Sequence, residues 1–327
     1  MNEKISRRHL LGAAAAATLA PLGLPALAEA WPSHPVRLVC PYAAGGSSDI
    51  LTRVLGEFLR QRLGQSVVVE NRAGAGTRIA NDYVAKAAPD GYTILHAAAP
   101  IAIGEALYQN LPYDLHKSFE PIVSTAIAPL FLVVNADAPY KTVAEFVKWG
   151  KANPKGFTFG SPGSGSAPHL TAELFIRASG AKGLVVQFKG DAPAYTELLA
   201  GRIDATLTAI STAVPYIQAG KLRVLAVANE TRTPLQPDTP TFVESGLKEV
   251  VGYGWYGLMA PAGTPGAVVQ RLNAETNAAV ADAEVRKKAE LAGLQLRGGT
   301  QAAFRTFLDA ETRKWAQVIK AAKITAE

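Results

Sequence analysis

The chain has 327 residues, of which 48% are hydrophobic and 18% charged, and its formal net charge is +6. Its basic residues form no Lys/Arg-rich block, which argues against a nucleic-acid partner and favours a small anionic ligand. About 300 residues with this apolar content can bury a large core and commonly divide into two domains. Cys40 is the only cysteine, so no intramolecular disulfide can form, and its apolar neighbours predict a core residue.

The first thirty residues are typical of an export signal. Residues 6–11 read SRRHLL, a twin-arginine motif, and an apolar run over 11–27 follows. Residues 28–30 (AEA) have the small-x-small form of a cleavage site, so we expect a periplasmic mature chain that begins at Trp31. A retained anchor is the alternative, but the run is Ala-rich and short for a span of about 20 strongly apolar residues. Cleavage would lower the formal charge by one.

Short β-branched runs alternate with segments of helical periodicity, which predicts an α/β protein with largely parallel sheets. The predicted strands cover residues 36–42, 66–70, 92–97, 130–134, 157–159, 184–188, 203–208 and 222–228. The predicted helices cover residues 49–63, a segment that ends near 87, residues 142–152, 170–179 and 192–200, and most of the chain after 265. We expect two domains, one formed by residues 31–130 with 250–327 and the other by residues 131–249.

Two Gly-rich turns each follow a predicted strand and open a predicted helix. Residues 43–49 read AAGGSSD, and residues 163–169 read GSGSAPH. The first turn of a helix presents unpaired N–H donors and a partial positive charge, and glycine lets a ligand approach the backbone. Ligands of open α/β sheets lie beyond the carboxyl ends of strands, so we expect both turns to hold an anion in a cleft between the domains. Taken singly, each turn also fits an ordinary capped loop.

Other motifs give no support for a cofactor or a metal. Residues 74–76 (GAG) begin like a dinucleotide fingerprint, but Ile79 replaces the third glycine, and no GxxxxGK[ST] loop occurs. No GxSxG nucleophile elbow is present, although Ser164 and Ser166 lie near His169. The five histidines show neither HxH nor HExxH spacing, so we expect no metal site. His169 is better explained as a lid on its turn or as a capping group.

A set of segments matches a known family in order and in spacing. These segments are WPSHPVRLV (31–39), AGGSSD (44–49), VENRAGAG (69–76), APDGYT (88–93), LPYD (111–114), KG with PA (189–190 and 193–194), AGKLR (219–223) and APAGTP (260–265). Together they resemble the tripartite tricarboxylate transporter receptor family, also called Bug-type periplasmic solute-binding proteins. The resemblance implies a two-lobed type II periplasmic-binding fold, or Venus flytrap, that closes over a small organic anion and delivers it to a two-component membrane permease.

The resemblance also implies where the ligand binds. In that family one carboxylate is typically held by backbone and hydroxyl groups of two loops, which match residues 42–49 and 163–169 here. The site residues expected on this basis are Tyr42, Ala44, Gly46, Ser47, Asp49, Ser164, Gly165, Ser166, His169 and, in the second domain, Thr208. Charged side chains usually contribute little in such sites, which fits a site that relies on N–H donors and helix dipoles.

Several positions depart from the family pattern and bear on the ligand. Ala44 stands where relatives often have Pro, and Ala209 follows Thr208 where relatives often have an Asp before an Asn. Without that carboxylate a ligand ammonium group is less well recognised, so we disfavour amino acids as ligands. Arg78 and His96 are candidates to pair with a distal carboxylate, and a purely structural role is the alternative for both.

The sequence therefore predicts a monomeric periplasmic receptor for a di-, tri- or aromatic carboxylate, with no catalytic residue and no cofactor. A periplasmic enzyme acting on a carboxylate is the alternative, with Asp49, Ser166 and His169 as candidate reactive groups. Asp49 has a simpler explanation, because a carboxylate at a helix start stabilises the dipole and can fix the loop by accepting N–H bonds. A ligand-sensing partner of a membrane sensor kinase would keep the same binding chemistry.

Overall fold

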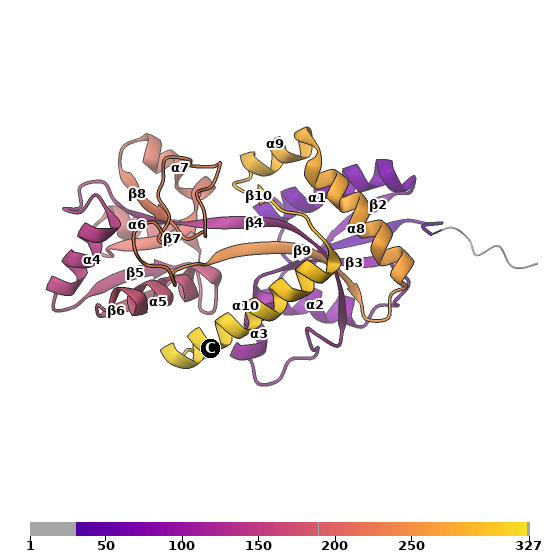
Figure 1. Cartoon of the computed structure of the whole chain (residues 1–327), viewed down its shortest axis with the longest axis horizontal. Helices are drawn as coiled ribbons and strands as arrows, with labels where there is room; N and C mark the ends of the chain where they lie inside the picture. The colour runs from indigo at the N-terminus through magenta and orange to yellow at the C-terminus, as the bar shows by residue number, and fades with distance from the viewer. Residues whose placement is uncertain (1–30, 189, 326–327) are drawn as a thin grey trace, which may run out of the picture. The chain divides into compact units, whose positions relative to one another are not determined.

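The computed structural model describes residues 31–188 and 190–325, so the predicted export signal lies outside the described residues. The chain from His34 onward forms one compact unit (Figure 1). Its elements are, in order, β1 (Val36–Cys40), α1 (Ser47–Leu63), β2 (Val67–Asn71), η1 (Ala75–Thr77), α2 (Arg78–Ala85), β3 (Thr93–Ala98), α3 (Pro100–Leu107), β4 (Phe119–Asn135), α4 (Val143–Ala152), β5 (Phe157–Ser161), α5 (Ala167–Ser179), β6 (Gly183–Gln187), α6 (Asp191–Leu199), β7 (Ala205–Ala209), α7 (Ile210–Gln218), β8 (Leu222–Val227), β9 (Tyr253–Pro261), α8 (Gly266–Ala281), α9 (Ala283–Leu291), β10 (Gln295–Leu296) and α10 (Gln301–Ala322). This order confirms the predicted α/β class. None of the described helices combines the length and the apolarity needed to cross a membrane.

The strands form one mixed sheet, with the order β2-β1-β3-β9-β4-β7-β5-β6 and with β8 and β10 paired to β4. At its two ends the pairing is parallel, β1 with β2 and β3, and β5 with β6 and β7. In the middle, β4 and β9 are antiparallel to each other and to their neighbours. The prediction of largely parallel sheets is therefore wrong for the centre, because the chain runs along β4 and returns along β9 in the opposite direction.

The first half of β4 and the whole of α3 were not predicted from the sequence. Proline cannot donate a hydrogen bond to a neighbouring strand and usually argues against a central strand, and β4 contains Pro121 and Pro129. The strand accommodates Pro121 where its register with β9 shifts, between Pro121 and Val123. In α3 the proline is Pro100, which opens the helix at a position that needs no N–H donor. The predicted two-domain division stays a prediction, because β4 crosses the boundary near residue 130 without a break.

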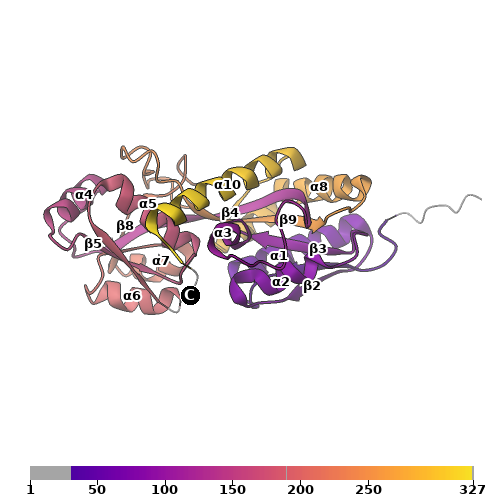
Figure 2. The same ribbon diagram turned by 90° about the horizontal axis from the view of Figure 1, so that it is seen from below.

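Alternate side chains of β4 enter four separate hydrophobic clusters, because successive side chains of a strand point to opposite faces. Near β3, Ile127 packs toward α2, α3 and α10, whereas Ala126 packs toward α1, α8 and α9. Near β7, Leu132 packs toward α4 and α5, whereas Val133 packs toward α6 and α7. Helices therefore cover both faces at both ends of the sheet, as Figures 1 and 2 show.

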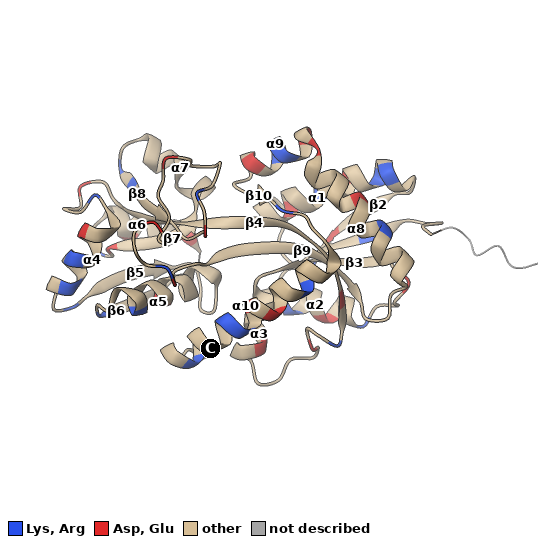
Figure 3. Ribbon diagram, in the orientation of Figure 1, with Lys and Arg blue, Asp and Glu red and all other residues tan. Residues whose placement is uncertain are grey.

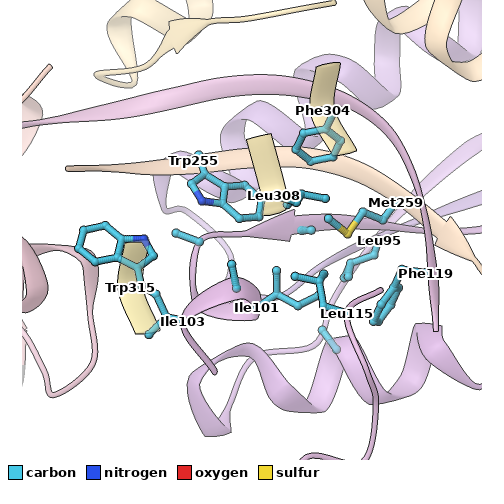
Figure 4. Close-up of a cluster of buried hydrophobic side chains, with 14 of the residues drawn as sticks. Leu95, Ile101, Ile103, Leu115, Phe119, Trp255, Met259, Phe304, Leu308 and Trp315 are labelled. Carbon is cyan, nitrogen blue, oxygen red and sulfur yellow. The ribbon is translucent and has the colours of Figure 1, made fainter. Parts of the chain in front are cut away.

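The cluster beneath β9 holds Trp255 in place (Figure 4). The Trp255 ring meets the ring of Phe304, from α10, edge to face, with centroids 6.0 Å apart and an interplanar angle of 82°. Two residues along β9, Gly257 leaves the space that Phe304 occupies, since a Cβ at this position would collide with the Phe304 ring. Trp255 is thereby fixed at the centre of the sheet.

Candidate functional site

A cavity of about 200 Å³ lies against the middle of β4 and β9, comparable with the volume of about seven water molecules. It is lined by Tyr42, Ala98, Ala99, Pro100, Ala128, Leu130, Pro162, Ser166, Ala167, Pro168, Asp191, Ala209, Gly254, Trp255 and Tyr256. Among these lining residues Asp191 alone is charged. Figure 3 shows the same scarcity of charge along the central parts of β4 and β9, which are drawn in tan.

Small residues keep the strand surface beneath the cavity open. Ala128 of β4 lies opposite Gly254 of β9, and a Cβ added to Gly254 would lie 3.3 Å from that of Ala128. The neighbouring Trp255 presents an indole Nε1 that is buried and has no hydrogen-bond partner among the described residues.

Four helices begin at the cavity wall. Ala99 is the N-cap of α3 and Ser166 that of α5, while Asp191 is the first residue of α6 and Ala209 is the N-cap of α7. Each helix start carries a partial positive charge and backbone N–H groups without an intrahelical partner. The lining residues that the structure describes include no Lys, Arg or His, and the four helix ends supply positive potential at the cavity wall.

The second predicted turn reaches the cavity through Ser166 and not through Ser164 or Gly165. The Ser166 hydroxyl donates to the Gly163 carbonyl at 2.7 Å and accepts the His169 N–H at 3.3 Å, which caps α5. His169 is buried and outside the lining, and its Nδ1 accepts the Gly165 N–H at 3.0 Å. Burial lowers the pKa of His169, which favours the neutral ring that this bond requires. Its position therefore fits the capping role considered from the sequence.

The first predicted turn is held by a buried carboxylate. Asp49 is 3% exposed and accepts the Gly45 N–H at 2.9 Å, the Asn71 amide at 2.8 Å and the Arg53 guanidinium at 3.0 Å. Asn71 also donates to the Tyr42 carbonyl at 2.9 Å and so joins the turn to β2.

Within this turn only Tyr42 lines the cavity. Ala44 and Gly46 are exposed, and the Ser47 hydroxyl donates to the Ala292 carbonyl at 2.9 Å.

Three other predicted site residues lie outside the lining. Arg78 donates from Nε to the Ala75 carbonyl at 2.8 Å and stacks on Tyr108, with its Cζ 4.1 Å from the ring centroid. His96 is fully buried, with its two ring nitrogens 2.6 Å and 3.0 Å from the Thr52 and Thr125 hydroxyls.

Burial lowers the pKa of His96 to about 3, so its ring stays neutral. Thr208 is also fully buried and reaches the cavity only through a hydrogen bond to Asp191. Of these three residues, only Thr208 bears on the cavity.

Several lining residues were missed by reasoning from the sequence, and Asp191 is the most consequential. A signal for it exists, because β6 is followed by Gly190, with a positive φ of 102°, and then by the start of α6. This is the same order of strand, glycine and helix start that identified the two turns. Pro100, Trp255 and Tyr256 had no comparable signal, since their position depends on where β4 and β9 cross the sheet.

The described residues contain no group of three or more His, Cys, Asp or Glu side chains that could hold a metal ion. A larger hollow of about 400 Å³ lies between α5 and α10 and includes Glu173, Arg177 and Val318. Its lining comes from the C-terminal halves of both helices, where no unpaired backbone N–H groups are available to an anion. The cavity over β4 and β9 is therefore the better candidate for an anion site.

Comparisons with known proteins agree with this arrangement. The profile of the tripartite tricarboxylate transporter family receptor matches residues 51–324. The periplasmic binding protein BugD is 34% identical, with a TM-score of 0.74 over 91% of this chain and 100% of that one. R. palustris Rpa4515, solved with adipate, is 32% identical, with a TM-score of 0.77 over 90% and 99%. MatC from Rhodopseudomonas palustris, solved with bound malate, is 30% identical, with a TM-score of 0.72 over 88% and 99%.

The Asp49 network makes a prediction about stability. Burial raises the pKa of Asp49, but the hydrogen bonds from Arg53, Gly45 and Asn71 outweigh it and hold the pKa below its ordinary value. We expect Asp49→Asn to lower the free energy of unfolding at pH 7 by about 1–3 kcal/mol.

A depressed pKa stabilises the fold above the unfolded-state value of about 3.9 and loses that effect as the pH falls through the folded-state value. The difference between the two proteins in urea unfolding should therefore shrink below about pH 4. Asp137→Asn, at an exposed site, is the control. A difference that stays constant with pH would contradict the role of the charge.

Proposed function

Because the chain belongs to the tripartite tricarboxylate transporter receptor family, we propose that it binds a small organic carboxylate in the cavity over β4 and β9. One observation carries the proposal: four helix starts meet at a cavity whose described lining residues include no Lys, Arg or His. The ligands of Rpa4515 and MatC, adipate and malate, support the same class of ligand. The family consists of receptors and not enzymes, which argues against the alternative of a carboxylate-processing enzyme.

The ligand carboxylate is best held near the starts of α3 and α5, where backbone N–H groups and two tyrosines come together. Tyr42 and Tyr256 both line the cavity. Burial raises the pKa of the Tyr256 hydroxyl to about 12 and raises that of Tyr42 further, so both stay protonated at neutral pH and can donate. In a site with few water molecules such hydrogen bonds are stronger than in bulk water.

Ligand binding is coupled, in this proposal, to closure of two lobes about β4 and β9. One lobe holds β1–β3 with α1–α3 and α8–α10, and the other holds β5–β8 with α4–α7. The two lobes approach each other closely at two glycines. Gly165, in the second lobe, lies against Leu107 of the first. Gly293, in the first lobe, lies against Ser211 of the second, so that a Cβ added to Gly293 would be 2.8 Å from the Ser211 hydroxyl. Both glycines have a positive φ, of 68° and 75°, which other residues rarely adopt.

The family description supports delivery of the ligand to a membrane permease of the tripartite type, from the periplasm. In this role the closed receptor presents the ligand, and the permease moves it. Uptake into membrane vesicles that contain the permease should require the mature protein, and equal uptake without it would contradict delivery. No observation on the described residues favours the alternative of a sensor-kinase partner.

Closure predicts a change in size on binding. The radius of gyration of the mature protein, measured by small-angle X-ray scattering, should fall when a saturating carboxylate ligand is added, because closing lobes exclude water from the cavity. A sugar that does not bind is the control. An unchanged radius of gyration in the presence of bound ligand would contradict closure and leave binding intact.

The binding proposal itself predicts a selective thermal shift. The mature protein from Trp31 is screened against mono-, di-, tri- and aromatic carboxylates and amino acids, with sugars as controls. A ligand present at 100 times its dissociation constant should add about 2.7 kcal/mol to the free energy of unfolding. Shifts with sugars alone, or with no member of the panel, would overturn the proposal.

A variant that fills the cavity tests whether the ligand binds there. Ala209→Leu adds three carbon atoms at a lining position at the start of α7 and should weaken carboxylate binding at least about tenfold. Ala219→Leu, exposed at the other end of the same helix, is the matched control and should bind as the wild type does. Equal affinity of the two variants would exclude this cavity as the site.

A further inference from the structure

Asp191 places a carboxyl group in a cavity that is proposed to receive an anion. It opens α6 and is the one charged side chain among the lining residues. The start of α6 stabilises a carboxylate there through the helix dipole, but that role needs no position in a cavity wall. Its location therefore calls for a second explanation.

A network of hydroxyl groups holds the Asp191 carboxyl. The Thr208 hydroxyl donates to Oδ1 of Asp191 at 3.3 Å. Thr208 in turn lies 2.7 Å from the Tyr195 hydroxyl and 3.0 Å from that of Thr212, and the last two lie 2.6 Å apart. No hydrogen bond or ion pair to the second oxygen, Oδ2, is made by any residue the structure describes, a set that omits residue 189. Thr208 thereby holds one oxygen of a carboxyl group that lines the cavity.

The surroundings of Asp191 disfavour its ionised form in the empty cavity. Burial raises the pKa of this carboxyl, and the hydrogen bond from Thr208 only partly opposes the shift. A positive group on the ligand would supply the missing counter-charge and stabilise the carboxylate. A ligand with a second carboxylate would do the opposite, because it would bring a second negative charge close to the Asp191 carboxylate, and the described lining residues include no cationic side chain.

We propose that Asp191 pairs with an ammonium group of the ligand, so that the ligand class of this receptor is amino carboxylates. The inference rests on the proposed function, since it needs the ligand carboxylate at the starts of α3 and α5. It reverses the sequence-based expectation that amino acids are disfavoured because Ala209 replaces an Asp. Ala209 and Asp191 line the same cavity, so α6 supplies a carboxylate that β7 lacks.

The test compares probes of equal length that differ at one end. Adipate, 6-aminohexanoate and hexanoate form one set, and succinate, 4-aminobutyrate and butyrate form a shorter set. Dissociation constants are measured by titration calorimetry for the wild-type mature protein, for Asp191→Asn and for the exposed control Asp137→Asn. Asp191→Ser gives the same comparison with a smaller side chain, should the first variant fold poorly.

In at least one set, the wild type should bind the amino carboxylate about tenfold or more tightly than the dicarboxylate, and the Asp191 variants should lose that preference. The Asp137 control should retain it. A wild-type preference for the dicarboxylate in both sets, or a preference that the Asp191 variants keep, overturns this inference and leaves carboxylate binding in place. If neither the wild type nor the variants bind any of the six probes or any other carboxylate, the proposed function itself is overturned.

Discussion

The antiparallel pair of β4 and β9 is the constraint on which the rest of the structure depends. Because side chains alternate along a strand, β4 contributes to the hydrophobic clusters on both faces and at both ends of the sheet. The same pair carries the floor of the cavity where Ala128 lies opposite Gly254. Small side chains at that point leave space, and the next residue of β9, Trp255, is packed against Phe304 of α10.

In the proposed binding mode, backbone N–H groups around that floor recognise the charge of the ligand. Four helix starts reach one cavity. Two basic residues considered near the site are engaged elsewhere: Arg53 is paired with Asp49, and Arg78 is stacked on Tyr108. Such preorganised N–H groups suit a small anion that must be released again, because no strong ion pair has to be broken. Under the proposal made above, the Asp191 carboxyl then selects among anions.

Reasoning from the sequence reached the α/β class and most helices, and it located two turns that each precede a helix, because these features depend on local patterns of glycine, capping residues and periodicity. The role of these turns in holding an anion stays a prediction. The same reasoning also foresaw that Asp49 could fix its turn by accepting backbone N–H bonds. It failed where tertiary placement decides. Because of Pro121, the first half of β4 was not predicted as a strand. The residues next to His96 in the sequence give no indication that the Thr52 and Thr125 hydroxyls lie against its ring nitrogens. Asp191 had a local signal, but its place in the lining is known only from the tertiary structure, which brings it to the same cavity as Gly254 and Tyr256 of β9.

The central claim is that helix ends, and not cationic side chains, hold the ligand carboxylate. A crystal structure of the mature protein with its tightest-binding carboxylate tests this most directly. The account predicts carboxylate oxygens about 2.7–3.2 Å from backbone N–H groups at the starts of α3 and α5, within the cavity over β4 and β9. A carboxylate paired with the Arg78 guanidinium, or bound in the hollow between α5 and α10, would contradict it.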